Sequence, residues 1–208
     1  MRNQKSIPCP NKFAIVVDGK CESWYLNMLK RNEKIKDINI EPKLPQKKKL
    51  CEQFEKVKEF SRIYDKVIWV IDLDVINKET KETKKGNSTA IQELKKYFKK
   101  IDKLYTNVIT IINNPCLEYW YLLHFEQTSK YYNNCGKVVK QIKKQERLTD
   151  YEKTEKYYTR QNSDIYLRLK PFLTDAITNA NLLDNFDFNN PCVGLSQMQK
   201  LFQLISIP

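Results

Sequence analysis

Glycine and histidine are both scarce in this 208-residue sequence, which contains four glycines and one histidine. The shortage of glycine argues against an all-β sandwich and against a glycine-rich phosphate-binding loop. The six cysteines form no Cys-x-x-Cys pair, so a tetrahedral zinc site would have to combine scattered cysteines.

Long apolar runs are also absent, because no stretch approaches the length that spans a membrane. The first 12 residues are polar and basic, unlike a secretory signal. We therefore expect a cytoplasmic protein with no membrane partner, whose cysteines are free thiols in a reducing compartment.

Positive charge is in excess, with a formal net charge of +12 from 37 basic and 25 acidic side chains. Such a balance favours a polyanionic partner, usually nucleic acid. Lys137, Lys140 and Lys144 share one helical face in a tyrosine-rich region, and Lys95 lies in a second basic segment. These lysines are candidate nucleic-acid contacts. The alternative is a lysine-coated surface that is only solvated.

Short apolar runs alternate with helical patterns up to residue 127. Buried strands are predicted at residues 13–17, 38–42, 66–71 and 108–112. Helices are predicted over 21–29, 47–64, 89–103 and 115–125, with a charged surface loop at 77–88. This alternation predicts an α/β fold, with a mainly parallel four-stranded sheet flanked by helices.

The sequence after Glu126 has a different character, since tyrosine, lysine and asparagine dominate and no further strand pattern is present. Helices are predicted there over 136–145, 151–158, 164–183 and 193–205. We divide the chain into an N-terminal arm (1–12), an α/β core (13–127) and a helical C-terminal extension (128–208) that packs on the core.

Acidic residues follow two of the predicted strands. Asp72 and Asp74 come directly after the strand at 66–71, and Asp18 follows the strand at 13–17. Because the carboxyl ends of parallel strands meet at one edge of a sheet, we expect these side chains to lie close together. Carboxylate oxygens are the ligands that Mg²⁺ and Mn²⁺ prefer, and such ions assist phosphodiester transfer.

Two residues of the next helix are further candidates at this edge. Asp18, at the end of the adjacent strand, is a candidate third ligand or general base, and Glu22, four residues later on the first helical turn, is placed to point back to the same edge. Lys20 is a possible phosphate ligand, although a lysine at this position is more often solvated. An Asp-x-Asp pair also occurs in ordinary turns and caps, so the pair alone does not establish a metal site.

The segment Asn113–Cys116 is predicted to begin a helix at the same edge, with asparagine as its N-cap and proline in its first turn. Glu118 and His124 lie on this helix. Both have ordinary explanations, since acids suit a helix N-terminus and a single histidine commonly packs or caps. Cys116 is not expected to be a catalytic nucleophile, because the sequence has no second histidine that would support a Cys–His pair.

Together these motifs resemble the RloB-like family of Toprim-fold proteins. The family pattern Glu-Gly-x-x-Glu matches residues 18–22, and its strand ending in Asp-x-Asp matches residues 70–74. The pattern Asn-Pro-x-x-Glu-x-Trp, followed by Leu-Leu-His-Phe, matches residues 114–120 and 122–125. Asn190-Pro191 is similar to the final Asn-Pro motif of the family. The resemblance covers about residues 12–206.

The resemblance implies a Toprim-like (Rossmann-like) fold and a magnesium- or manganese-dependent nuclease of bacterial anti-phage defence, in restriction or abortive infection. It implies that Asp18, Asp72 and Asp74 are metal ligands. Other candidate catalytic residues, which take further family positions, are Glu22, Glu118 and His124.

One departure from the family pattern concerns Asp18, which is one methylene shorter than the family's glutamate. Two alternatives to a nuclease acting on DNA or RNA stay open. One is a non-catalytic protein that binds nucleic acid or a partner and has a degenerate site. The other is an enzyme that processes a small phosphorylated nucleotide. Besides nucleic acid, a homo-oligomer and a defence-system protein are the partners to consider.

Overall fold

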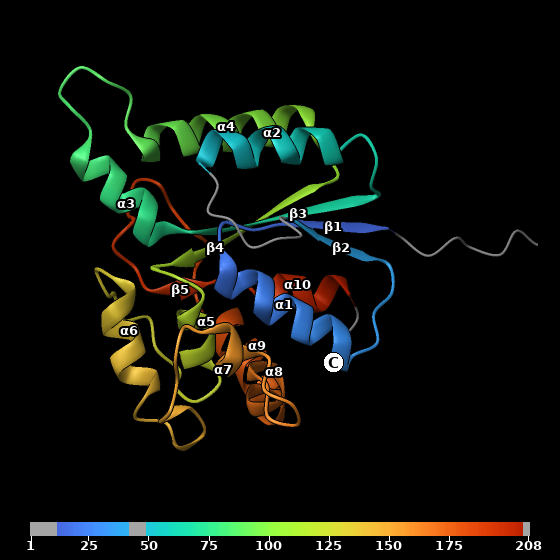
Figure 1. Ribbon diagram of the computed structural model, residues 1–208. Helices are drawn as coiled ribbons and strands as arrows, with labels where there is room; N and C mark the ends of the chain where they lie inside the picture. The colour runs from blue at the N-terminus through green and yellow to red at the C-terminus, as the bar shows by residue number, and fades with distance from the viewer. Residues whose placement is uncertain (1–11, 42–48, 206–208) are drawn as a thin grey trace, which may run out of the picture.

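The structure is a computed structural model that describes residues 12–41 and 49–205 (Figure 1). Of the predicted N-terminal arm only Lys12 is described, and residues 42–48 and 206–208 also lie outside the described part. Among the described residues, no helix is both long enough and apolar enough to cross a membrane.

A single sheet, with strand order β2-β1-β3-β4-β5, runs through the described part of the chain. Strands β1 to β4 pair in parallel, and β5 pairs antiparallel to β4. The strands are β1 (Phe13–Val16), β2 (Ile38–Glu41), β3 (Lys66–Asp72), β4 (Val108–Asn114) and β5 (Leu195–Ser196). The predicted α/β class, with helices around a mainly parallel sheet, is confirmed.

Helices cover both faces of this sheet (Figure 1). One layer contains α2 (Leu50–Phe60), α3 (Leu73–Glu82) and α4 (Ala90–Leu104). The other contains α1 (Lys20–Asn32), α5 (Glu118–Leu123), α6 (Cys135–Ile142), α7 (Glu155–Tyr158), α8 (Ile165–Leu169), α9 (Leu173–Asn181) and α10 (Gln199–Leu204). Two 3-10 turns, η1 (Glu146–Leu148) and η2 (Lys170–Phe172), lie between these helices in sequence.

The alternation of side chains along each strand produces two separate cores. In β3, Ile68 and Val70 pack with α1 and α5, whereas Trp69 and Ile71 pack with α2 and α4. Because both faces are covered, the strand is apolar at every position from Val67 to Ile71 rather than at alternate ones. This is why a continuous apolar run, ending in charge, identified β3 in the sequence.

The predicted loop at 77–88 is wrong in its first half, because α3 begins directly after β3 and continues to Glu82. Only two of its side chains, those of Leu73 and Ile76, are buried. Its charged residues Lys78, Glu79, Lys81 and Glu82 are exposed, and Lys78 and Glu82 lie 3.9 Å apart one turn from each other. A helix with so narrow an apolar face has the polar composition of a loop.

The predicted helix at 193–205 is also wrong in its first half, where the short strand β5 replaces it and α10 begins only at Gln199. The side-chain amide of Asn114 donates to the carbonyl oxygens of Pro191 and Val193, at 2.7 and 2.8 Å. These bonds hold residues 191–193 against the end of β4, so the chain enters the sheet as a fifth strand. The prediction of four strands therefore missed one.

The helix predicted from Pro115 begins later, at Glu118, because Asn113 and Asn114 belong to β4. Neither asparagine caps α5. Their side chains instead bond to Asp72 and to the segment before β5. Glu118 is consequently the first residue of the helix rather than one turn inside it.

Candidate functional site

Four carboxylates gather at the carboxyl ends of β1 and β3, as the strand order predicts. They line a pocket of about 350 Å³. Asp18 comes from the turn after β1, Glu22 from the first turn of α1, Asp72 from the last position of β3, and Asp74 from the first turn of α3. The remaining lining residues are Gly19, Lys20, Cys21, Val75, Cys116 and Lys153.

Asp72 is oriented by two hydrogen bonds, one from the end of β4 and one from the segment between β4 and α5. The Asn113 side-chain amide donates to Oδ1 at 3.0 Å, and the Leu117 backbone N–H donates to Oδ2 at 2.9 Å. The backbone N–H of Asp74 donates to the carbonyl oxygen of Pro115 at 2.8 Å. The segment 113–117 thus fixes both members of the acid pair, which explains why an Asn-Pro motif lies next to this site.

Asp18 is oriented from the opposite face of the sheet. The side-chain amide of Gln53, on α2, donates to Asp18 Oδ1 at 2.7 Å and accepts from the indole N–H of Trp69 at 2.9 Å. An indole can only donate, so Trp69 determines which end of the amide faces Asp18. The shorter carboxylate at this position therefore has a dedicated donor.

Negative charges crowd together at the buried side of the pocket and repel one another, although a side-chain hydrogen bond with Asp72 lowers the pKa of Glu22 in part. Glu22 and Asp72 are both less than a tenth exposed. Burial, and then the charge of Glu118, raises the pKa of Glu22 to about 7. Burial and the charge of Glu22 raise the pKa of Asp72 well above its ordinary value. A bound cation would relieve this repulsion.

The chemistry of the pocket suits a hard divalent cation. Its ligand atoms are carboxylate oxygens, which Mg²⁺ and Mn²⁺ prefer, and the pocket has room for the water molecules that Mg²⁺ retains. Asp18, Asp72 and Asp74 are the residues that would hold such an ion. Glu22 would lie beside them as a further ligand or as a base.

Glu118 lies in a separate, buried cluster beside the pocket and is 1% exposed. Its Oε1 accepts from the Tyr151 hydroxyl at 2.6 Å and pairs with the Lys153 ammonium at 2.7 Å. The Tyr158 hydroxyl lies 2.5 Å from that of Tyr151. Burial alone would lower the pKa of Lys153, but the Glu118 carboxylate outweighs it and raises that pKa above the ordinary value. Glu118 is therefore an ion-paired carboxylate.

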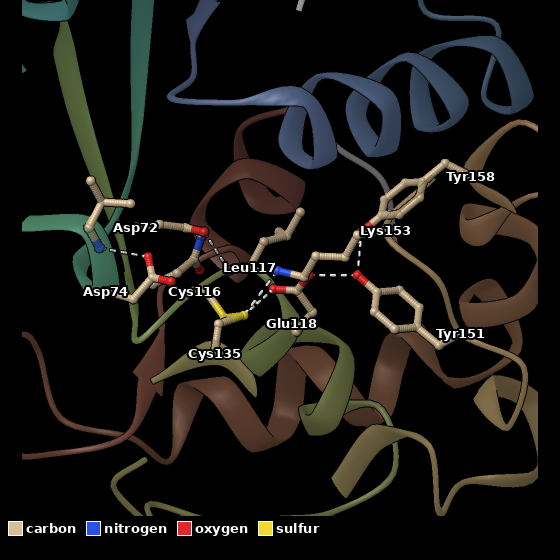
Figure 2. A network of polar contacts seen from close by, with 11 residues as sticks. Asp72, Asp74, Cys116, Leu117, Glu118, Cys135, Tyr151, Lys153 and Tyr158 are labelled. Atoms are coloured by element: carbon tan, nitrogen blue, oxygen red, sulfur yellow. Dashed lines mark hydrogen bonds and ion pairs between the residues drawn. A yellow bond between two sulfur atoms is a disulfide. The ribbon is translucent and has the colours of Figure 1, made fainter. Parts of the chain in front are cut away.

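A disulfide bond between Cys116 and Cys135 joins the chain before α5 to the start of α6. The prediction that all cysteines are free thiols is wrong for these two. The two cysteines are 19 positions apart in sequence, which predicts no pairing. Packing of α5 against α6 brings them together. Figure 2 shows Glu118 between this disulfide and the side chains of Tyr151 and Lys153.

Among the described residues, the two sulfurs and the Glu118 carboxylate, rather than the acids of the pocket, are the group whose candidate ligand atoms all lie within 4.8 Å of one another. In this structure the sulfurs are bonded to each other, and the ammonium of Lys153 is the cation beside the carboxylate. Neither a disulfide nor an ion-paired carboxylate is a good metal ligand. The group is thus a covalent and ionic link rather than a second metal centre.

His124 lies at the C-terminal end of α5, away from the lining of the acidic pocket. It is buried, its Nδ1 lies 2.9 Å from the carbonyl oxygen of Trp120, and its ring contacts those of Trp120 and Phe125. Burial lowers its pKa to about 4, so the ring is neutral at pH 7. These surroundings match the packing role that a single histidine commonly has.

The candidate lysines do not form one surface. Lys20 lines the acidic pocket. Lys137 and Lys140 line a pocket of about 310 Å³ on α6 together with Tyr131 and Tyr132, among others. Lys144, just beyond α6, donates to Gln141, whereas Lys95 projects from α4 on the opposite face of the sheet, near Phe188. The pocket lined by Lys137 and Lys140, which we call the basic groove on α6, is therefore separate from Lys95.

Sequence reasoning missed several residues that support the site. Gln53, Tyr151, Lys153 and Cys135 have no local pattern that separates them from the many similar residues of this chain. Each acquires its role from a contact across at least 15 residues of sequence. Ser196, whose hydroxyl donates to Asn113 at 2.6 Å, belongs to a strand that the sequence did not predict.

Comparison with known proteins supports the motif-based resemblance. A family model described as RloB-like protein matches residues 13–205. No curated protein and no solved structure matches. Since the match covers nearly the whole sequence, including both acidic strand ends and the Asn-Pro segment, the chain belongs to the RloB-like protein family.

Proposed function

We propose that this protein is a magnesium- or manganese-dependent nuclease that hydrolyses phosphodiester bonds of DNA or RNA. The observation that carries the proposal is the single pocket lined by Asp18, Glu22, Asp72 and Asp74 at the carboxyl ends of two parallel strands. Hydrogen bonds from Gln53 on α2, Asn113 on β4 and the Leu117 N–H just before α5 hold Asp18 and Asp72 in place.

The residues of the chain have distinct roles in this proposal. Asp18, Asp72 and Asp74 bind the cation, which when bound neutralises phosphate charge and stabilises the attacking and leaving oxygens. Glu22, on the first turn of α1 and lining the same pocket, accepts a proton from the attacking water. The net charge of +12 and the basic groove on α6 attract the polyanion.

We extend the proposal to a role in bacterial defence against phage, on the basis of the family resemblance. Phage plaque counts on cells that carry the wild-type gene or the gene with Asp72→Asn test this extension separately from the chemistry. Protection that is equal for both genes would contradict a defence role that uses this site.

Cleavage of labelled single-stranded DNA, duplex DNA and RNA in Mg²⁺, Mn²⁺ or EDTA tests the nuclease proposal. We expect metal-dependent cleavage that falls at least about 100-fold in Asp72→Asn and Asp74→Asn. Asp102→Asn is the control, because this exposed acid lies on α4 outside the pocket. Circular dichroism verifies that each variant is folded.

Two results would count against the proposal. Cleavage that survives both substitutions would show that the activity lies elsewhere or in a contaminant. Oligonucleotide binding without turnover in any divalent metal would instead favour the alternative, a binding protein with a degenerate site.

A further inference from the structure

Lys153 connects the buried Glu118 cluster with the acidic pocket. Its ammonium lies 2.7 Å from Glu118 Oε1 and 3.2 Å from the Sγ of Cys135. Nevertheless the side chain is 46% exposed, while that of Glu118 is 1% exposed. Lys153 also lines the pocket that contains Asp18 and Asp72. The Lys153 ammonium thus contacts Glu118 on one side, and the exposed part of the side chain borders the acidic pocket.

The anchor holds this charge in a defined position. Glu118 is the first residue of α5, and the Tyr151 hydroxyl bonds to the same carboxylate oxygen as Lys153. The other oxygen lies 2.8 Å from Cys135, which the disulfide ties to the chain before α5. Because the carboxylate is fixed from both sides, the flexible lysine side chain loses much of its freedom before any ligand arrives (Figure 2).

We propose that Lys153 binds a non-bridging oxygen of the substrate phosphodiester, and that Glu118 and Tyr151 are residues that position it. This inference rests on the proposed function of the same pocket. It also assigns Glu118 a positioning role in place of the direct catalytic role that the motif suggested.

Charge balance in the pocket favours a phosphate as the ligand of Lys153. Among the described residues that line the pocket, Lys20 and Lys153 are the lysines. They share this lining with four carboxylates. A phosphodiester that enters the pocket brings more negative charge next to these carboxylates. A lysine in the pocket lining lowers the electrostatic free energy of that approach. Lys20 is exposed and forms none of the ion pairs found among the described residues, whereas Lys153 is held in place.

In this proposal Lys153 binds the phosphate and does not transfer a proton. The ammonium keeps its three protons and donates one N–H to the phosphate oxygen while its bond to Glu118 persists. Such a preorganised donor stabilises the negative charge that the phosphoryl oxygens carry during displacement, without having to reorient. The proton released by the attacking water goes to the Glu22 carboxylate, since the lysine is already protonated.

Removal of the lysine alone is ambiguous, because it leaves the buried Glu118 without its cation. The informative variant is the neutral pair Glu118→Gln with Lys153→Met, which removes both charges and keeps similar shapes. Lys153→Arg retains the charge. Lys156→Met is the matched control, because this exposed lysine lies three residues away on α7.

Binding of a fluorescent 12-nucleotide single strand in Ca²⁺, followed by anisotropy over a range of salt concentrations, tests the proposal without requiring turnover. We expect the neutral pair to bind about 10-fold more weakly, with a salt slope reduced by about 0.7. In Mg²⁺ its cleavage rate at saturating substrate should fall about 100-fold. Lys153→Arg should retain part of both properties, and Lys156→Met should retain the cleavage rate.

The outcomes separate this inference from the nuclease proposal. A wild-type protein that fails to cleave, yet binds the strand with a dependence on Lys153, supports the phosphate contact and overturns the nuclease function. A folded neutral pair that binds and cleaves like wild type overturns the phosphate contact and leaves the nuclease function intact. A wild-type protein that binds no strand in Ca²⁺ overturns the phosphate contact.

Discussion

The side-chain amide of Asn113 donates a hydrogen bond of 3.0 Å to Oδ1 of Asp72, from the neighbouring strand of the sheet. At the other end of the amide, the Ser196 hydroxyl donates to Asn113 Oδ1 at 2.6 Å. β5 thereby contributes to the site through β4, although its own side chains do not line the pocket.

Replacement of Asn113 by leucine should weaken the binding of divalent metal. Residues that orient a metal ligand typically contribute about 10- to 100-fold in metal affinity, and we expect a loss near the lower figure because the Leu117 N–H still holds Oδ2. Titration with Mn²⁺ by calorimetry measures the change. Ser196→Ala should have a smaller effect, and an unchanged affinity in Asn113→Leu would exclude the orienting role.

Gln53→Leu should destabilise the fold as well as the site, because the buried indole N–H of Trp69 loses its acceptor. A buried donor without a partner costs about 1–3 kcal/mol of unfolding free energy. The same change in a Trp69→Phe background should cost less, since no donor is then left unpaired. Urea unfolding of the four proteins in this double-mutant cycle measures the coupling, and additive effects would contradict it.

The pH dependence of stability should carry the signature of Glu22. Its pKa is about 7 in the folded protein against an ordinary value of 4.5. The folded state therefore binds a proton more tightly, and the unfolding free energy decreases as pH rises through this window. This direction is opposite to that of an ion-paired carboxylate. Glu22→Gln should remove about 1–3 kcal/mol of that decrease.

Urea unfolding in EDTA between about pH 4.5 and pH 7.5 measures this difference between wild type and Glu22→Gln. His124, whose pKa is lowered to about 4, acts in the opposite direction and cancels because both proteins retain it. Parallel pH profiles would refute the prediction. Addition of Mg²⁺ should stabilise wild type more at the upper end of the range, where the carboxylates are ionised.

Reduction of the Cys116–Cys135 disulfide should lower the unfolding free energy by about 2–4 kcal/mol, because the bond restricts the unfolded chain. Urea unfolding with and without dithiothreitol measures the loss. A variant with serine at both positions should have the lower stability in both conditions. The other four cysteines, Cys9, Cys21, Cys51 and Cys192, remain in that variant, so any reductant effect that persists there would come from them.

Local sequence patterns are sufficient to predict the four parallel strands and the meeting of Asp18, Asp72 and Asp74 at one edge. The reason is that a strand buried on both faces must be apolar at every position, and parallel strands place their carboxyl ends together. The glycine at position 19 also has a local cause. A Cβ there would lie 3.0 Å from Oε2 of Glu22, which is only three residues away in sequence.

Long-range packing determines the state of the charged and reactive groups. Glu118 and His124 lie six residues apart on one predicted helix, yet one is ion-paired beside the site and the other is packed away from it. Lys153 and Cys135 meet Glu118 only because the chain after α5 folds back onto that helix. Sequence spacing does not encode such contacts, since their partners are brought together by burial of apolar surface far from the polar atoms themselves.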